Sequence, residues 1–113
     1  MKNVNEYLKS NPVVEKFIAE VNQSISEHYR TNLPNLTFEP VKVTIGAKFI
    51  AIEHKGTRWG FISRVDGTHM GVPIRKGDLM KPATWAQAAK HSRGNIADGT
   101  ARWGVYGPDY LTR

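Results

Sequence analysis

The sequence predicts an α+β protein, in which an N-terminal amphipathic helix packs on an antiparallel sheet of four to five strands, with a short helix near residues 83–91. Two observations lead to this prediction. Apolar side chains recur every three to four residues over residues 12–30, which is the period of a helix buried on one side. From residue 41 onward the period falls to two, in short segments separated by turns that contain glycine or proline.

The N-terminal helix is expected over about residues 12–30. Asn11 can cap free backbone N–H groups, and Pro12 at the first helical position loses no hydrogen bond. The apolar stripe consists of Val13, Val14, Phe17, Ile18, Val21, Ile25 and Tyr29. A shorter turn of helix is expected at about residues 3–9. Residues 31–40 contain two prolines and are predicted as a connector.

The first three strands are expected between residues 41 and 65. Residues 41–45 alternate apolar and polar side chains, which predicts a half-buried strand. Residues 47–54 and 57–65 are rich in β-branched and aromatic side chains. The short link through Lys55 and Gly56 favours an antiparallel hairpin between them.

The rest of the chain is predicted as a loop, a strand, a short helix and a last strand. Residues 68–77 contain two glycines and a proline, which favours a loop, and residues 78–81 favour a short strand. Thr84 can cap the short helix, because the alanines and glutamine that follow are good helix formers. Gly94 would end this helix, and residues 101–107 would form the last strand.

The positive charge lies almost entirely in the C-terminal part of the chain. One domain is expected, with a helical part and connector at residues 1–40 and a basic, β-rich part at residues 41–113. Residues 1–41 carry four Lys/Arg and five Asp/Glu, whereas residues 42–113 carry twelve and five, a net charge of +7. This asymmetry suggests a face that meets nucleic acid or, less readily, an anionic membrane or an acidic protein. The alternative is that the chain is basic merely for solubility.

Targeting signals and disulfides are not expected. The sequence has no cysteine, and no apolar run approaches the ~20 residues of a membrane span. The N-terminus also lacks the apolar region of a signal peptide. We therefore expect a cytoplasmic protein with no membrane partner, while the oligomeric state stays open.

Basic and aromatic residues are interleaved in a way that is typical of proteins that bind single-stranded nucleic acid. Such proteins hold phosphates with cations and stack bases on aromatic rings, at ~1–3 kcal/mol per base. The candidate contacts are Arg58, Trp59, Lys81, Trp85, Lys90, His91, Arg93, Asn95, Arg102 and Trp103. The alternative is that the tryptophans are core residues and that the arginines lie across their rings.

Residues 90–95 allow two interpretations. In the first, Gly94 turns backbone N–H groups toward an anion, and Lys90, His91 and Arg93 converge on it as in a phosphate nest. In the second, the same residues form the basic last turn and the glycine cap of the short helix. Arg93 and Asn95 are the pair best able to make directed hydrogen bonds to phosphate or to base edges.

The sequence gives little support to catalysis. His28, His54, His69 and His91 lack the spacing of metal ligands, and the acids of the basic part are too far apart to hold magnesium. No cofactor is expected, and an enzyme is not expected. A metal-free ribonuclease that uses Lys90, His91 and Arg93 stays open, because the 2′-hydroxyl of RNA needs only a base and a cation.

Residues 77–96 and the end of the chain resemble a family of small bacteriophage-encoded proteins. Its members carry a pattern close to G-D-[ILV]-x-K-P-A-[ST]-W-x-x-x-A-K-H-x-R-G-N-I, which "GDLMKPATWAQAAKHSRGNI" matches. They often end in Tyr-Gly-Pro, a variable residue and Tyr-Leu, as "YGPDYL" does. The sequence departs from the pattern by a longer loop at residues 67–77, where the pattern usually has a tight hairpin. The resemblance implies a phage origin and expression inside a bacterium, and it supplies no activity.

Three functions are open at this point. The leading one is a small non-enzymatic phage accessory protein of the host cytoplasm that binds nucleic acid, single-stranded DNA or RNA, with low sequence specificity. The second is a module that binds a host or phage protein, as an inhibitor or a minor virion component, with exposed tryptophans as anchors. The third is the metal-free ribonuclease.

Overall fold

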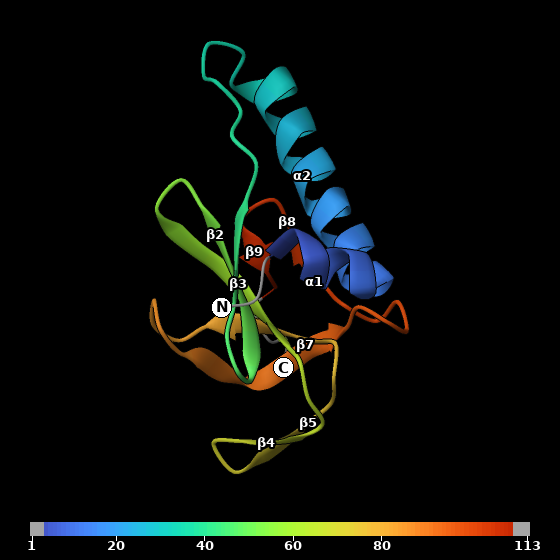
Figure 1. Ribbon diagram of the computed structural model, residues 1–113. Coiled ribbons are helices and arrows are strands. Elements are labelled where there is room, and N and C mark those ends of the chain that lie inside the picture. The colour runs from blue at the N-terminus through green and yellow to red at the C-terminus, as the bar shows by residue number, and fades with distance from the viewer. Residues whose placement is uncertain (1–3, 110–113) are drawn as a thin grey trace.

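The computed structural model describes residues 4–109 as two helices followed by an antiparallel sheet (Figure 1). The elements are α1 (Val4–Ser10), α2 (Pro12–Asn32), β1 (Lys42–Ile45), β2 (Phe49–His54), β3 (Thr57–Ser63), β4 (Gly67–His69), β5 (Val72–Ile74), β6 (Asp78–Pro82), β7 (Ala88–Asn95), β8 (Trp103–Gly104) and β9 (Gly107–Pro108). One sheet has the order β1-β2-β3-β6-β7, and β4 with β5 and β8 with β9 form separate ribbons. The α+β class, the N-terminal helix and the antiparallel sheet are confirmed.

Two predictions reach beyond these residues. The first turn of helix was expected to begin near residue 3, and the Tyr-Leu end of the phage pattern falls at residues 110 and 111. Both positions lie outside the described residues.

α2 covers one face of the sheet with the apolar side that the sequence predicts (Figure 1). The buried residues of α2 are Val14, Phe17, Ile18, Val21 and Ile25. They share one core with Ile50, Ile52, Ile62 and Leu79 of the sheet, which have no exposed surface. Burial of a side chain of this size stabilises the fold by about 1.5–3 kcal/mol. We call this side of the sheet the helix face and the other side the outer face.

Asn11 connects the two helices, and its predicted side-chain cap on α2 is absent. Its Nδ2 donates to the carbonyl oxygen of Tyr7 at 2.7 Å, and no side-chain hydrogen bond caps α2. The backbone carbonyl of Asn11 accepts the N–H of Glu15 at 3.0 Å, which starts the helical ladder. Val13, predicted in the buried stripe, is 46% exposed and borders a cavity.

The outer face carries a smaller core beneath the β4–β5 ribbon. Its buried residues are Phe61, Ile74, Met80 and Ala88. His69 Nε2 donates to the carbonyl oxygen of Ala88 at 2.9 Å, and the His69 ring lies edge-on to Phe49 with 5.0 Å between ring centroids. The ribbon is therefore fastened to both β7 and β2.

The prediction of a loop at residues 68–77 is largely wrong, because part of this segment pairs as the β4–β5 ribbon. Thr68 pairs with Pro73, and His69 pairs with Val72. The turn lies at Met70 and Gly71, whose φ angles are 53° and 80°. The glycine and proline that favoured a loop thus form the tight turn and the adjoining strand of a hairpin.

The short helix predicted near residues 83–91 is absent, so this part of the prediction is wrong. Residues 83–87 form a turn, in which the first two backbone N–H groups donate to the Gln87 carbonyl at 2.8 and 3.1 Å. Thr84 Oγ1 accepts two further N–H groups and so caps the turn. The chain continues as β7, where pairing with β6 and burial of Ala88 outweigh helix propensities of less than ~1 kcal/mol per residue.

The last strand predicted at residues 101–107 is a two-stranded ribbon, β8 with β9. It lies on the helix face, where Trp59 Nε1 donates to the Val105 carbonyl at 3.2 Å. Gly107 has φ 130°, and a Cβ atom there would lie 2.7 Å from the Trp59 carbonyl oxygen. The ribbon therefore requires glycine at this position.

Neither described helix is long and apolar enough to cross a membrane.

Candidate functional site

Trp59 and Trp103 belong to the packing between α2 and the sheet. Trp59 is 3% exposed, and its ring lies edge-on to the rings of Phe17 and Trp103, at centroid distances of 6.1 and 5.9 Å. Trp103 is half-buried and lies 5.4 Å from Phe17. Trp59 has no face left for a base, so its predicted role in stacking is wrong. Trp103 keeps part of its ring at the border of a cavity.

Trp85 lies in the turn between β6 and β7 and is 50% exposed. The guanidinium carbon of Arg58 lies 4.0 Å from the centroid of the Trp85 ring, and Arg58 Nε donates to the Trp85 backbone carbonyl at 2.8 Å. The same guanidinium lies 5.4 Å from the ring of Phe61, on the outer face. Arg58 therefore ties the turn to β3 and supports the Trp85 ring.

Two lysines and one carboxylate lie on the same outer face. The register pairs Lys42 with Glu53, and Glu53 with Arg58, and residues opposite each other share one face. Lys90 is exposed on β7, midway between Ala88 and Ser92, which pair with Pro82 and Met80 of β6, and it lies on the outer face with them although the pairing is irregular over this stretch. The charge of the four side chains is positive, because three cations accompany one acid.

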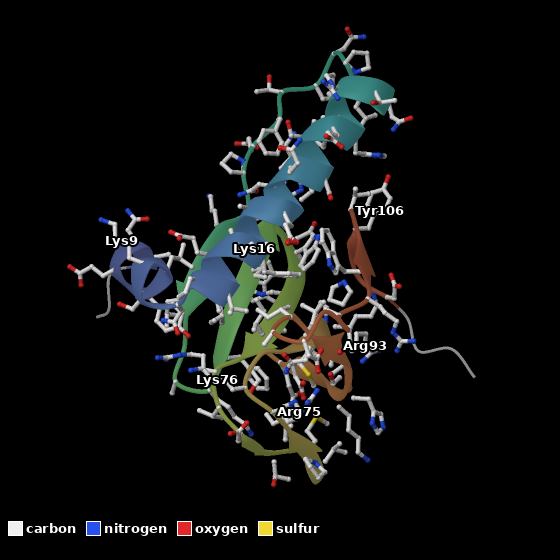
Figure 2. All side chains as sticks on the ribbon, turned by 90° about the vertical axis from the view of Figure 1, so that its right-hand side faces the viewer. Lys9, Lys16, Arg75, Lys76, Arg93 and Tyr106 are labelled. Carbon is white, nitrogen blue, oxygen red and sulfur yellow. The ribbon has the colours of Figure 1, made fainter. Side chains whose placement is uncertain are left out.

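Arg93 is buried on the helix face, beside the last described segment (Figure 2). It is 7% exposed, its Nε donates to the Asp109 carbonyl at 3.0 Å, and its Nη1 donates to the carbonyl of His91. Burial lowers the pKa of Arg93, and the nearby charge of Arg102 lowers it further. Most of the Arg93 guanidinium thus binds backbone, and only a small part can meet a ligand.

Asn95 is part of the structural framework, which contradicts its prediction as a base contact. It is 3% exposed, and its Nδ2 donates to the Lys76 carbonyl at 2.9 Å and to Asp78 Oδ1 at 3.0 Å. Its Oδ1 accepts the N–H of Ala97 at 2.8 Å. Asp78 is 4% exposed and also accepts the Arg75 N–H at 2.9 Å. The sequence analysis did not predict the contact between Asn95 and Asp78. The one sequence feature that they share is a preceding glycine, Gly94 and Gly77.

Gly94 fits neither interpretation of residues 90–95. It lies inside β7, so it ends no helix, and its N–H donates to Ser92 Oγ at 3.0 Å, so it does not face an anion. Its φ is 97°, and a Cβ atom there would lie 2.0 Å from the Thr100 carbonyl oxygen. Gly94 is required because the loop after β7 folds back onto it.

The remaining candidates lie at the β7 edge and on the helix face. Lys81 Nζ donates to the Pro108 carbonyl at 3.2 Å, while the backbone N–H of Arg102 donates to the Arg93 carbonyl at 2.8 Å. The side chains of Arg102 and His91 are exposed. The ten predicted residues therefore do not form one surface. Arg58, Trp85 and Lys90 lie on the outer face, and Lys81, Arg93 and Arg102 lie around the ribbon on the helix face.

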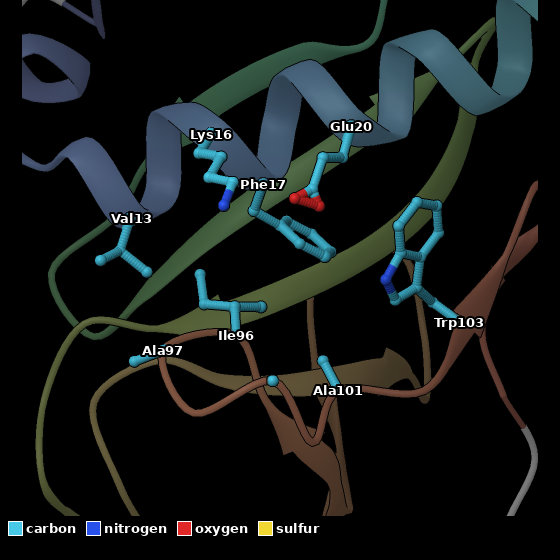
Figure 3. A pocket seen from close by; sticks show the side chains of 9 residues that line it. Val13, Lys16, Phe17, Glu20, Ile96, Ala97, Ala101 and Trp103 are labelled. Atoms are coloured by element: carbon cyan, nitrogen blue, oxygen red, sulfur yellow. The ribbon is translucent and has the colours of Figure 1, made fainter.

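Two cavities lie between α2 and the segment that follows β7. The first, of ≈ 380 Å³, is lined by Val13, Lys16, Phe17, Glu20, Ile96, Ala97, Gly99, Ala101 and Trp103 (Figure 3). The second, of ≈ 310 Å³, shares Val13, Ile96 and Ala97 with it. Lys16 and Glu20 enter from α2, and Trp103 closes the far side of the first cavity (Figure 3). This groove was not predicted, because it depends on how the loop after β7 meets α2.

Within residues 4–109, no group of three or more His, Cys, Asp or Glu side chains is arranged to hold a metal ion. Comparison of the chain with protein-family models, with curated proteins and with solved structures gives no match.

Proposed function

We propose that the protein binds single-stranded nucleic acid, with low sequence specificity, through a surface formed by Lys42, Arg58, Trp85 and Lys90, the Trp85 surface. The observation that carries the proposal is the half-exposed Trp85 ring stacked on Arg58. Exposure of a large ring within a charged surface is typical of a binding site.

The Trp85–Arg58 pair is suited to stack on a nucleobase. Arg58 covers one side of the ring and bonds the backbone of the same residue, so that the ring is held in place before a ligand arrives. A pre-organised side chain loses little conformational entropy on binding. A base stacked on Trp85 is expected to contribute ~1–3 kcal/mol to the free energy of binding.

Phosphate contacts would come from the three cations of the Trp85 surface. Lys42 and Lys90 are exposed, whereas Arg58 is half-buried and already contacts the ring. Glu53, between Lys42 and Arg58 in the register, offsets part of their charge. Neutralisation of two to three phosphates gives a log–log salt slope of about −1.4 to −2.1 for single strands, at −0.7 for each phosphate.

Low sequence specificity is expected from the same geometry. Every base has a face that can stack on an aromatic ring, so stacking discriminates little between sequences. Asn95, the amide expected to read base edges, uses its side chain within the protein.

A binding titration at several salt concentrations tests the proposal. Quenching of tryptophan fluorescence is measured with a short thymidine oligomer, with the matching uridine oligomer, and with duplex DNA. Saturable quenching by both single strands, with a negative salt slope, supports the proposal. Absence of binding at low salt, or an affinity that does not change with salt concentration, contradicts the proposal. Cleavage of the uridine oligomer during prolonged incubation would instead favour the metal-free ribonuclease.

We further propose that the protein is a non-enzymatic phage accessory protein acting in the cytoplasm of an infected bacterium. The support is the resemblance of residues 77–96 to the phage family. Fractionation of an infected culture tests this part, with recovery in the soluble host fraction as the expected outcome and recovery with purified virions as the contrary one.

A second candidate function is binding of a host or phage protein at the groove beside α2. The observation in its favour is Val13, which is 46% exposed at the border of a cavity that also contains Phe17 and Trp103. Pull-down from nuclease-treated host lysate with the wild type and with Val13→Asp separates the two functions. A stoichiometric partner that only the wild type retains would favour protein binding, and equal retention would exclude this groove.

A further inference from the structure

The side chains of two cations, Lys81 and Arg93, and the backbone of a third basic residue, Arg102, bind the backbone of the last described residues, on the helix face. Lys81 Nζ donates to the Pro108 carbonyl at 3.2 Å, and Arg93 Nε donates to the Asp109 carbonyl at 3.0 Å. Arg102 is joined to both sides of this arrangement. Its N–H donates to the Arg93 carbonyl at 2.8 Å, and its carbonyl accepts the Asp109 N–H at 3.0 Å. The three cations thus come from β6, from β7 and from the segment before β8.

The Arg93 guanidinium is fixed in place and has one nitrogen to spare. Nε and Nη1 donate to backbone carbonyls, whereas Nη2 has no hydrogen-bond partner among the described residues. No described side-chain nitrogen is both fully buried and without a partner, so Nη2 reaches solvent. A residue that is 7% exposed therefore presents a single N–H donor group at the surface.

The charge of Arg93 is not neutralised within the described part of the chain. The ion pairs among residues 4–109 join Arg75 to Asp78 and to Asp98, and none involves Arg93 or Arg102. Asp109 is exposed, and only its backbone contacts these cations. Buried arginine is normally paired with an anion, because removal of its charge from water is costly.

We propose that Arg93, Arg102 and Lys81 form a binding site for one phosphate group, which we call the Arg93 site. Arg93 Nη2 supplies a donor whose position two backbone carbonyls fix, and the exposed side chain of Arg102, whose charge acts on Arg93, supplies a second cation. Guanidinium groups bind phosphate through directed, charge-assisted hydrogen bonds. The identity of the phosphate as part of a nucleic-acid strand rests on the function proposed above.

The Arg93 site and the Trp85 surface lie on opposite faces of the sheet and share the edge strand β7. Lys90 projects from β7 to the outer face, His91 is exposed, and Arg93 projects to the helix face. A single strand that binds both sites would therefore cross the β7 edge, where His91 lies on its path. In this arrangement the Trp85 surface stacks a base and the Arg93 site holds a phosphate of the same strand.

The direct test is an NMR titration of the arginine Nε–H signals of the full chain with inorganic phosphate. Sodium chloride of equal ionic strength serves as the reference. The Arg93 Nε–H is hydrogen-bonded to Asp109, so its signal is expected to exchange slowly enough to be followed. A saturable shift of this signal with phosphate, absent with chloride, is the expected result. An equal shift in both salts, or no shift, overturns the proposal.

Substitutions of exposed side chains test the Arg93 site without a change in the buried core. Arg102→Gln alters an exposed side chain and should weaken phosphate binding about fivefold, whereas Asp109→Asn should strengthen it about twofold, because near-surface charges contribute up to ~1 kcal/mol. Arg30→Gln, an exposed arginine of α2, is the matched control and should leave the affinity unchanged. Equal affinity of the wild type and Arg102→Gln for inorganic phosphate would contradict the proposed site.

Oligonucleotide arms separate this inference from the proposed function. A thymidine oligomer with a 5′-hydroxyl and one with a 5′-phosphate are compared on the wild type and on Arg102→Gln. Loss of affinity for both oligomers assigns a backbone phosphodiester to the site, and loss for the 5′-phosphorylated oligomer alone assigns a terminal phosphate. If inorganic phosphate binds and neither oligomer does, the Arg93 site stands and the proposed function fails. If the oligomers bind without moving the Arg93 signal, the proposed function stands and the site fails.

Discussion

The two ends of the segment 77–96 and its middle have opposite environments. Asp78 and Asn95, near the ends, are at most 4% exposed and bond to each other across β6 and β7. Residues 83–87, in the middle, are all exposed and include Trp85. One short stretch of sequence therefore combines a buried polar network with a surface turn.

The difference shows that polar residues within one pattern can serve unrelated purposes. The Asn95 side chain donates to the Lys76 carbonyl and to the Asp78 carboxylate, and it accepts the N–H of Ala97, so it serves three buried or half-buried polar groups. Within residues 4–109, the Trp85 ring packs against the Arg58 guanidinium and stays half-exposed. Mutations at the ends should therefore change stability, and mutations in the middle should change binding.

The largest effect on stability is expected from Gly94→Ala. The new Cβ atom would meet the Thr100 carbonyl oxygen at 2.0 Å, and the φ of 97° disfavours any side chain. Strain and overpacking together are expected to destabilise the protein by about 3–5 kcal/mol, measured by urea unfolding. Gly99→Ala is the control, because its φ is 77° but nothing lies within 4 Å, so about 1–2 kcal/mol is expected. Equal losses would mean that the loop after β7 does not press on Gly94.

A smaller loss of stability is expected from Asn95→Ala. The substitution removes the Asn95 amide donor from Asp78 Oδ1 and from the Lys76 carbonyl, while Asp78 keeps the Arg75 N–H, and the loss is expected to cost about 2–4 kcal/mol in unfolding free energy. Asn35→Ala, in the exposed connector, is the control and should be close to neutral. If instead Asn95→Ala leaves stability intact but abolishes oligonucleotide binding, the contrast between the ends and the middle is broken.

The middle of the segment is tested by Trp85→Ala. Loss of one stacked base should weaken binding of a thymidine oligomer by ~1–3 kcal/mol, with little change in unfolding free energy. Leu36→Ala is the control, because Leu36 is an apolar residue that is 53% exposed and lies in the connector between α2 and β1, outside both proposed binding surfaces. Equal affinity losses in the two variants would show that the Trp85 surface is not the binding site.

The smallest effect concerns pH and the loop behind Gly94. Asp98 accepts hydrogen bonds from the Thr100 hydroxyl and N–H, and these bonds lower its pKa below the ordinary value of 3.8. A depressed pKa in the folded state means that the charged form stabilises the fold above about pH 4, and that this contribution is lost as the pH falls through the lowered pKa. Unfolding curves of the wild type and Asp98→Ala should therefore differ near neutral pH and converge in acid. A difference that grows in acid would contradict this sign.

Some of the residues predicted as contacts are accessible and others are buried, and burial has the same cause in each case. Trp85, Arg58 and Lys90 were predicted as contacts and are accessible on one face. Trp59 and Asn95 were predicted as contacts and are buried, because their partners are distant in sequence, as Val105 is for Trp59. Spacing along the chain carries no information about such partners.

The sequence by itself determined α2, whose predicted range of residues 12–30 became Pro12–Asn32, and the paired strands β2 and β3. In these elements the period of apolar side chains and the short hairpin link act through near neighbours. Tertiary structure decided the conformation of residues 83–95, which form a turn and the strand β7 in place of the predicted helix. There the ladder with β6, the bonds from Asn95 to Lys76 and Asp78, and the contact of Gly94 with Thr100 overrode a helical propensity. The physical reason is that intrinsic propensities amount to less than ~1 kcal/mol per residue, and buried polar contacts between distant residues outweigh them.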